Sequence, residues 1–331
     1  MTLPPIGVIG AGAWGTALAQ VAAQAGGHSV VLWLRDGAAA AEINRTHSNE
    51  AKLPGVALSP AIVATAAASD LNACRIVLVA APAQAVRSVL ATVAGHLPPA
   101  VRLVMTAKGF ERGTAALMTD IMAEVCPAAE PLVLSGPSFA GDVVRGLPTA
   151  VTLAARTIEG AEDVAQNLSS PTFRLYLSDD LTGVQVGGAV KNILAIACGI
   201  VAGRGLGESA RAALMARAFA ELTRVGRALG ARSETMAGLS GLGDLVLTCS
   251  SAQSRNYRLG MALGEGRALS DILGTQRGTS EGAFTASVVV EIARRHGVDV
   301  PIIAGVTDIL EGRATIDTVM GHLLQRPIKA E

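Results

Sequence analysis

The sequence predicts an α/β fold, with an N-terminal doubly wound domain followed by an all-α C-terminal domain. In the first half of the chain, short apolar runs alternate with helical patterns. A glycine-rich stretch follows the first apolar run, and after about residue 180 helical patterns follow one another directly. We therefore expect a dinucleotide-binding domain over residues 1–180 and an all-helical substrate domain over 181–331.

Six apolar runs are expected to form a parallel sheet that helices cover on both faces. Such a sheet is buried on both sides, so its strands are rich in Val, Ile and Leu without a polar alternation. The expected strands are 5–10, 29–34, 76–82, 101–107, 131–136 and 148–155, and the segments 12–26, 83–94 and 113–125 are expected to be helices.

The second half contains few strand patterns. Its expected helices are 182–203, 208–229, 254–264, 283–296 and 305–325. Gly230 and Gly297 directly follow two of them, where glycine commonly ends a helix. A polar patch at 178–180 marks the expected domain boundary, and because no Pro- or Ser-rich linker is present we expect the two parts to pack tightly.

The composition limits the classes of partner. Lys and Arg number 27 and balance 27 Asp and Glu, so no excess charge favours nucleic acid or an anionic membrane. The five histidines have no metal-binding spacing, and the four cysteines are far apart, which favours reduced, buried thiols and no metal site.

No segment is expected to enter a membrane. The first 34 residues are apolar but contain no Lys or Arg, so they lack the charged start of a signal peptide. The longest later apolar run, 193–203, has 11 residues, whereas a bilayer-spanning helix needs about 20. We therefore expect a cytoplasmic protein.

The stretch GAGAWG (10–15) predicts a dinucleotide site of the Rossmann type. Its glycines Gly10, Gly12 and Gly15 follow a strand and open a helix, where they allow a tight turn and let the backbone approach a pyrophosphate. The alternative is a glycine-rich turn that binds no nucleotide. About 20 residues further on, where the ribose is recognised, Asp36 suggests NAD and Arg35 suggests NADP, so the choice stays open.

Polar residues follow the carboxyl ends of successive expected strands, where open α/β sheets bind ligands. Lys108 follows the run at 101–107, and Ser138 follows the run at 131–136. Each has a simpler alternative. Lys108 can be an ordinary loop lysine, and Ser138 can cap the next helix.

The helical half contains a pattern suited to a phosphate group. Ser254, Arg255 and Asn256 open a helix and combine a hydroxyl, a guanidinium and an amide, which suits an anion at a helix N-terminus. The alternatives are that Ser254 is only an N-cap and Arg255 only a surface charge.

Lys191 and Asp244 are two isolated opposite charges in apolar segments. Residues three and four positions from Lys191 on its helix cannot accept a hydrogen bond by side chain. Because a buried charge needs a partner, we expect the two to pair at one polar site between the domains. Gly187 and Gly188 are expected to leave room there for substrate and nicotinamide. Desolvation lowers the pKa of a lysine, which suits a general acid and base beside a hydride-transfer cofactor. The alternative is a lysine that reaches out to water.

Six stretches together resemble one family. VIGAGAWGTALA (8–19), LVMTAKGFE (103–111), VLSGPSFA (133–140), GVQVGGAVKNILAIACGI (183–200), GLSGLGDLVLTC (238–249) and SRN (254–256) closely resemble the bacterial NAD(P)-dependent glycerol-3-phosphate dehydrogenase family in order and spacing. The resemblance implies reversible reduction of dihydroxyacetone phosphate to sn-glycerol 3-phosphate with NAD(H) or NADP(H), which supplies glycerophospholipid synthesis.

The resemblance also implies roles for individual residues. Lys191 matches the proton donor and acceptor, and Asp244 matches an aspartate of the substrate site. The other matched positions are Ser254, Arg255 and Asn256 for substrate, with Arg255 also near the cofactor; Lys108, Gly136 and Ser138 for substrate and nicotinamide; and Ala13, Trp14, Arg35, Ala140 and Glu281 for the cofactor.

Some positions depart from the family pattern, and two other functions stay open. The departures are Gly141, Asp142, Ser209, Ala218, Tyr257 and the stretch 279–286. One rival is a related two-domain dehydrogenase of a 3-hydroxy acid or a pantoate-type substrate. The other is a dinucleotide-sensing protein without catalysis. As partners we expect the phosphorylated substrate and a second copy of the chain in a homodimer, with no nucleic acid and no membrane insertion.

Overall fold

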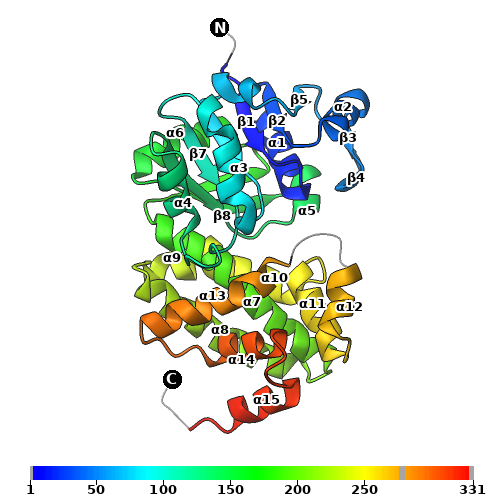
Figure 1. The fold of residues 1–331 in the computed structure, drawn as a ribbon, viewed down its shortest axis with the longest axis vertical. Helices are drawn as coiled ribbons and strands as arrows, with labels where there is room; N and C mark the ends of the chain where they lie inside the picture. The colour runs from blue at the N-terminus through cyan, green and yellow to red at the C-terminus, as the bar shows by residue number, and fades with distance from the viewer. Residues whose placement is uncertain (1–2, 276–279, 328–331) are drawn as a thin grey trace. The chain divides into compact units, whose positions relative to one another are not determined.

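The computed structural model describes residues 3–275 and 280–327. Thr279, the first residue of the stretch 279–286 that departs from the family pattern, therefore lies outside the described residues. Two compact units form: Met1–Lys108 with Ala116–Gln185, and Gly109–Ala115 with Val186–Glu331. Figure 1 shows that the labelled strands belong to the first unit. The assignment of cofactor binding to residues 1–180 and of substrate binding to 181–331 stays a prediction.

The first unit is built on an eight-stranded sheet in the order β10-β9-β8-β7-β6-β1-β2-β5. Its strands are β1 (Ile6–Ile9), β2 (Val30–Trp33), β5 (Ile62–Thr65), β6 (Ile76–Val79), β7 (Arg102–Met105), β8 (Glu130–Ser135), β9 (Thr149–Ala154) and β10 (Phe173–Ser178). The accompanying helices are α1 (Ala13–Ala25), α2 (Gly37–Thr46), α3 (Val86–Val93), α4 (Met118–Val125), α5 (Ala140–Val144) and α6 (Ile158–Leu168).

Both faces of the sheet are buried at its central strands, such as β1 and β6, as the continuous apolar runs predict. Alternate residues of a strand point to opposite faces. Accordingly Ile76 and Leu78 of β6 join a core that includes Leu18 of α1, while Val77 and Val79 join a second core that includes Leu90 of α3. The predicted doubly wound sheet is confirmed.

The strand order reverses beside β1. The chain runs from β1 to β2 and β5 on one side and returns to β6 on the other side. In open α/β sheets a ligand binds outside the carboxyl ends of the strands at such a switch point. The glycine-rich turn that follows β1 therefore lies at the position where this architecture binds ligands.

One strand differs in direction from the prediction. β9 pairs antiparallel with β8, through Val133 opposite Ala154 and Ser135 opposite Thr152. A parallel neighbour requires a crossover that returns along the whole sheet, usually through a helix. The connection between β8 and β9 contains only the five-residue α5, which is too short to do so. β10 then pairs parallel with β9.

The structure contains other elements that the sequence patterns did not predict. They include α2, α6, β5, β10 and a hairpin of β3 (Ser48–Asn49) and β4 (Leu53–Ala57). The helix predicted over 305–325 is two helices, α14 (Pro301–Leu310) and α15 (Ile316–Leu324), because Gly312 takes a φ of 69° between them. The helix predicted over 113–125 begins only at Met118, after Gly113 with a φ of 86°.

The second half is helical, and no described residue beyond Leu181 lies in a strand. Its further helices are α7 (Leu181–Gly203), α8 (Glu208–Ala228), α9 (Ser233–Ala237), α10 (Asp244–Ser250), α11 (Arg255–Gly264), α12 (Leu269–Thr275) and α13 (Glu281–Arg295). By length and composition α7 could cross a membrane, but 83% of its most apolar window is buried inside the protein, as in a core helix.

Candidate active site

The turn between β1 and α1 requires its outer two glycines. Gly10 has a φ of 104°, and a Cβ there would lie 3.0 Å from the carbonyl oxygen of Ala80, which follows β6. A Cβ on Gly15 would lie 1.8 Å from the carbonyl oxygen of Gly10. The chain can therefore pass from strand to helix this tightly, at the switch point, only with glycine at both positions.

The start of α1 fits the diphosphate of a dinucleotide. Among the described residues no side chain caps this helix, and its first turn holds no acidic residue. The space around a Cβ on Gly12 is open. The buried indole nitrogen of Trp14 has no hydrogen-bond partner in the described part of the chain. Unsatisfied backbone N–H groups, the positive end of a helix dipole and a free indole donor all suit a bound anion.

Arg35 and Asp36 follow β2 but are used differently. Asp36 caps α2, because its Oδ1 accepts hydrogen bonds from the N–H groups of Ala38 at 3.0 Å and Ala39 at 3.1 Å. Arg35 is exposed, and no ion pair to it occurs within residues 3–275 and 280–327. Capping gives Asp36 a structural role that the sequence did not reveal, and the choice between NAD and NADP stays open.

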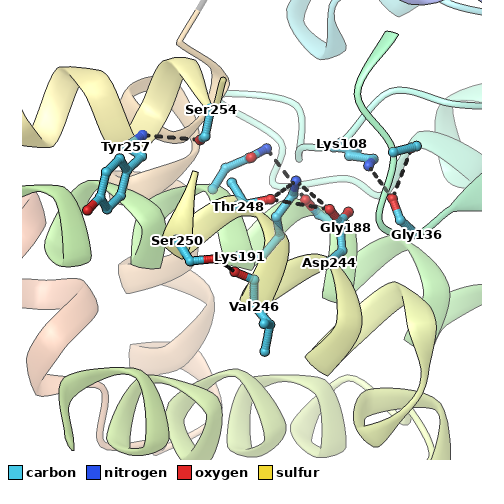
Figure 2. A network of polar contacts seen from close by, with 12 residues as sticks. Lys108, Gly136, Gly188, Lys191, Asp244, Val246, Thr248, Ser250, Ser254 and Tyr257 are labelled. Atoms are coloured by element: carbon cyan, nitrogen blue, oxygen red, sulfur yellow. Dashed lines mark hydrogen bonds and ion pairs between the residues drawn. The ribbon is translucent and has the colours of Figure 1, made fainter. Parts of the chain in front are cut away.

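Lys108 and Ser138 meet at the backbone of Gly136, just after β8. The carbonyl oxygen of Gly136 accepts from Nζ of Lys108 at 3.2 Å (Figure 2). It also accepts from Oγ of Ser138 at 3.1 Å. Gly136 has a φ of 149°, and a Cβ there would lie 2.9 Å from Cα of Val151. Ser138 does not cap α5, because the N-cap of that helix is Phe139, with no side-chain hydrogen bond. The role of Lys108 in binding substrate and cofactor stays a prediction.

Ala140 is the first residue of α5, which packs against α1. It belongs to the partly buried apolar residues around the first core, together with Ala13 and Trp14. Three of the predicted cofactor contacts, Ala13, Trp14 and Ala140, thus pack against the same core.

The predicted pair of Lys191 and Asp244 is present in the second unit. Nζ of Lys191 donates to Oδ1 of Asp244 at 2.9 Å and to Oγ1 of Thr248 at 2.7 Å (Figure 2). The side chains of Lys191 and Asp244 are 8% and 1% exposed. The lysine therefore does not reach out to water.

Gly187 makes this pairing possible, one helical turn before Lys191. A Cβ at position 187 would lie 2.6 Å from the carbonyl oxygen of Ser240. Ser240 belongs to a π-helical turn, Leu239–Gly243, that leads directly into Asp244. The close approach of this turn to α7 places the carboxylate beside the ammonium. The expectation that Gly187 leaves room for substrate and nicotinamide is wrong, because the backbone of Ser240 lies there.

Thr248 is the polar partner that the sequence analysis missed. Its hydroxyl donates to Oδ1 of Asp244 at 3.2 Å while accepting from Lys191. Thr248 follows Asp244 by four residues on α10, so the two side chains share one helix face. This spacing could have identified it. Beyond Thr248, burial raises the pKa of the Cys249 thiol well above its ordinary value.

The SRN stretch forms the N-terminus of α11. Oγ of Ser254 accepts from the N–H of Tyr257 at 3.2 Å, so Ser254 is the N-cap. Oδ1 of Asn256 accepts from the N–H of Gly282 at 3.2 Å. Arg255 is exposed, and the described residues offer it no ion pair. The guanidinium is therefore available to an anion from solution.

Two further contacts place this helix end near Lys191. A Cβ on Gly282 would lie 2.6 Å from the carbonyl oxygen of Asn192, the residue after Lys191. A Cβ on Gly199 of α7 would lie 2.1 Å from the carbonyl oxygen of Tyr257 on α11. Such backbone contacts fix α11 and α13 against α7. Glu281 begins α13, directly before Gly282.

The predicted site residues thus form two groups, one in each unit. The first group is Gly10, Gly12, Ala13, Trp14, Gly15, Arg35, Lys108, Gly136, Ser138 and Ala140, and the second is Lys191, Asp244, Ser254, Arg255, Asn256 and Glu281. All four cysteines are buried and free of disulfides. The described residues contain no cluster of His, Cys, Asp and Glu that could hold a metal ion.

Comparison with known proteins identifies relatives along the whole chain. The model for the N-terminus of NAD-dependent glycerol-3-phosphate dehydrogenase matches residues 5–161, and the model for its C-terminus matches residues 180–321. The glycerol-3-phosphate dehydrogenase (NAD(P)+) of Maricaulis maris is 54% identical over 326 residues, which is 98% of each chain. That of Methylobacterium radiotolerans is 54% identical over 99% of this chain and 98% of its own.

Solved structures agree with these relatives. The glycerol-3-phosphate dehydrogenase of Coxiella burnetii superposes with a TM-score of 0.92 at 35% identity, covering 98% of this chain and 99% of its own. A ketopantoate reductase from Ralstonia eutropha, 16% identical with a TM-score of 0.60, shares the fold alone over 93% of this chain and 97% of its own. This chain therefore belongs to the NAD-dependent glycerol-3-phosphate dehydrogenase family.

Proposed function

We propose that this chain is an NAD(P)-dependent sn-glycerol-3-phosphate dehydrogenase that reversibly reduces dihydroxyacetone phosphate to sn-glycerol 3-phosphate. The observation that carries the proposal is the buried Lys191 ammonium, bonded to Asp244 and Thr248. Proteins rarely bury a lysine side chain. A reaction that interconverts a ketone and an alcohol needs a proton donor and acceptor, and a buried lysine can serve as one. Membership of the dehydrogenase family supports the same reaction.

The proposed mechanism assigns the proton to Lys191. In the reducing direction, Nζ of Lys191 donates a proton to the oxygen that forms on substrate C2, and in the oxidising direction it accepts that proton. Asp244 stabilises the ammonium and, with Thr248, holds Nζ in position. When bound, the nicotinamide supplies or accepts the hydride. The same group of atoms serves both directions, as reversibility demands.

Two further sets of residues bind the reactants in this proposal. The cofactor is held by Gly10, Gly12, Ala13, Trp14, Gly15, Arg35, Lys108 and Ala140, with Arg255 and Glu281 from the second unit. The substrate phosphate is bound by Ser254, Arg255 and Asn256 at the N-terminus of α11, and the remainder of the substrate by Lys108, Gly136 and Ser138. An exposed guanidinium at a helix N-terminus suits a phosphate dianion.

The proposal also covers the metabolic role, the compartment and the oligomeric state of the protein. The product is the backbone of glycerophospholipids, so we place the reaction in their synthesis. We further propose a cytoplasmic homodimer that needs neither nucleic acid nor membrane insertion. Size-exclusion chromatography with light scattering tests the oligomeric state.

The decisive assay follows oxidation of NADH and of NADPH in parallel, with and without dihydroxyacetone phosphate. We expect substrate-dependent oxidation with at least one of the two. Ketopantoate and a 3-ketoacid serve as control substrates, because an unphosphorylated substrate does not need the guanidinium of Arg255. Turnover of a control substrate alone would identify a related dehydrogenase. Cofactor binding without turnover of any substrate would identify a sensor.

A further inference from the structure

A buried amide joins the β3–β4 hairpin to the glycine-rich turn. Asn49, the last residue of β3, is 8% exposed. Its Nδ2 donates to the carbonyl oxygen of Ala11 at 3.1 Å and to Oγ1 of Thr16 at 2.8 Å. Ala11 belongs to the turn, and Thr16 lies in the first turns of α1. The Asn49 side chain therefore forms hydrogen bonds to both the turn and the helix that follows it.

The chemistry of these partners fixes which way the amide faces. A backbone carbonyl oxygen can only accept a hydrogen bond, so the nitrogen of Asn49 and not its oxygen must face Ala11. The carbonyl of Ala11 and the N–H of Gly12 belong to one planar trans peptide and point in opposite directions. By holding the carbonyl, Asn49 also sets the direction of the Gly12 N–H.

We propose that Asn49 is a positioning residue for the cofactor. It holds the peptide between Ala11 and Gly12 so that the Gly12 N–H, on the side away from Asn49, is presented to the diphosphate of a bound dinucleotide. The inference rests on the proposed function only in requiring a dinucleotide, whatever the second substrate is. Gly12 suits this approach because it is exposed, with open space around its Cβ position.

The chain offers a matched control in Gln20, another buried amide that ties α1 to the region of the hairpin. Gln20, on α1, accepts with Oε1 from the N–H of Ser59 at 2.8 Å, just beyond β4. It is buried as well, at 7% exposure. Gln20 therefore ties the hairpin region to α1 without contacting the glycine-rich turn. A change at Gln20 loosens the packing but leaves the peptide of Ala11 untouched.

The test compares Asn49→Ala with Gln20→Ala by four measurements. These are the Kd values for NADH and NADPH from fluorescence titration without substrate, the KM for each reactant, kcat and the Tm. For Asn49→Ala we expect cofactor Kd and KM to rise about tenfold, the effect of losing one ordered hydrogen bond. We expect kcat and the KM for dihydroxyacetone phosphate to stay within about twofold, since neither depends on the orientation of this peptide. Gln20→Ala should lower Tm but leave cofactor Kd within about twofold.

Two outcomes overturn the inference. One is an Asn49→Ala variant that binds both cofactors as the wild type does. The other is a Gln20→Ala variant whose cofactor binding weakens as much as that of Asn49→Ala. If Asn49→Ala does not fold, Asn49→Ser replaces it with the same criteria. If the wild-type protein binds dinucleotide but does not turn over dihydroxyacetone phosphate, only the proposed function is disproved. The cofactor Kd values of Asn49→Ala and Gln20→Ala still test the role of Asn49.

Discussion

Nζ of Lys191 and Oδ1 of Asp244 lie 2.9 Å apart, and both side chains are buried although 53 residues separate them in the chain. Each charge offsets part of the free energy that burial of the other costs, because a buried charge without a partner is strongly destabilising. Thr248 completes the arrangement by bonding both. The ammonium is thereby held at one point, as a group that must meet a reacting oxygen requires.

Replacing Lys191 tests its role in proton transfer. Lys191→Met removes the donor, and we expect kcat to fall by at least about 100-fold, the usual contribution of general acid and base catalysis. The Kd for NADH and NADPH should stay within about twofold, because the predicted cofactor contacts do not include this side chain. Stopped-flow oxidation of the cofactor with dihydroxyacetone phosphate measures kcat, and fluorescence titration measures the cofactor Kd.

Lys191→Arg is the matched control. It keeps a positive charge beside Asp244 but carries a planar group that rarely gives up its proton. We expect turnover to stay low although the charge is retained. Wild-type turnover in Lys191→Met would disprove the catalytic assignment.

A double-mutant cycle tests how the pair contributes to stability. Lys191→Met alone leaves the Asp244 carboxylate buried without its cation, and we expect a loss of about 3–5 kcal/mol in the free energy of unfolding. Asp244→Asn restores much of this loss when combined with Lys191→Met, because the double variant buries no charge. Urea unfolding of the four proteins gives the coupling energy. Additive losses would mean that the two side chains do not depend on each other.

Thr248 is expected to position Lys191 rather than to react. Thr248→Val keeps the shape but removes the oxygen that accepts from Nζ at 2.7 Å. We expect kcat to fall about tenfold, as one orienting hydrogen bond is lost, with a shifted pH profile of kcat and unchanged cofactor Kd. Thr307→Val is the control, because the hydroxyl of Thr307 bonds only the carbonyl oxygen of Ile303 on its own helix among the described residues. Equal effects of the two changes would refute a positioning role.

The sequence predicts the elements whose side chains are apolar on both faces, and it predicts the pair of isolated charges. A short apolar run such as 76–79 favours a strand buried on both sides, and β6 is such a strand. Lys191 and Asp244 could be matched because neither has a residue of opposite charge near it in the sequence. Both predictions rest on a local pattern whose alternatives cost free energy: apolar side chains exposed to water in the first case, and unpaired buried charges in the second.

Other features depend on contacts that no local pattern encodes. The direction of β9 follows from the length of its connection to β8. Gly187 is glycine because the backbone of Ser240 approaches it, and Asn49 matters because Ala11 lies beside it in space. Residues with ordinary composition and distant partners are visible only once the chain is folded.

Glu221 provides a test of pH dependence away from the proposed site. Its side chain, 1% exposed, accepts from the N–H groups of Ile302 at 2.8 Å and Ile303 at 3.0 Å, at the start of α14. Burial raises the pKa of its carboxyl from 4.5 to about 7; the two backbone donors and Arg224 act against this rise, and Asp299 adds to it. The carboxyl is thus a weaker acid in the folded chain than in the unfolded chain.

This difference determines how stability changes with pH. Between about 4.5 and about 7 the folded state binds more protons than the unfolded state, so the contribution of Glu221 is full at low pH and is lost as pH rises through about 7. The change corresponds to about 3 kcal/mol at most. Glu221→Gln cannot ionise, so its free energy of unfolding minus that of the wild type should increase as pH rises from 5 to about 7 and should level off above that. Urea unfolding at each pH measures this difference, and Glu265→Gln at an exposed position controls for the substitution itself. A constant difference between Glu221→Gln and the wild type over this range would show that Glu221 keeps an ordinary pKa.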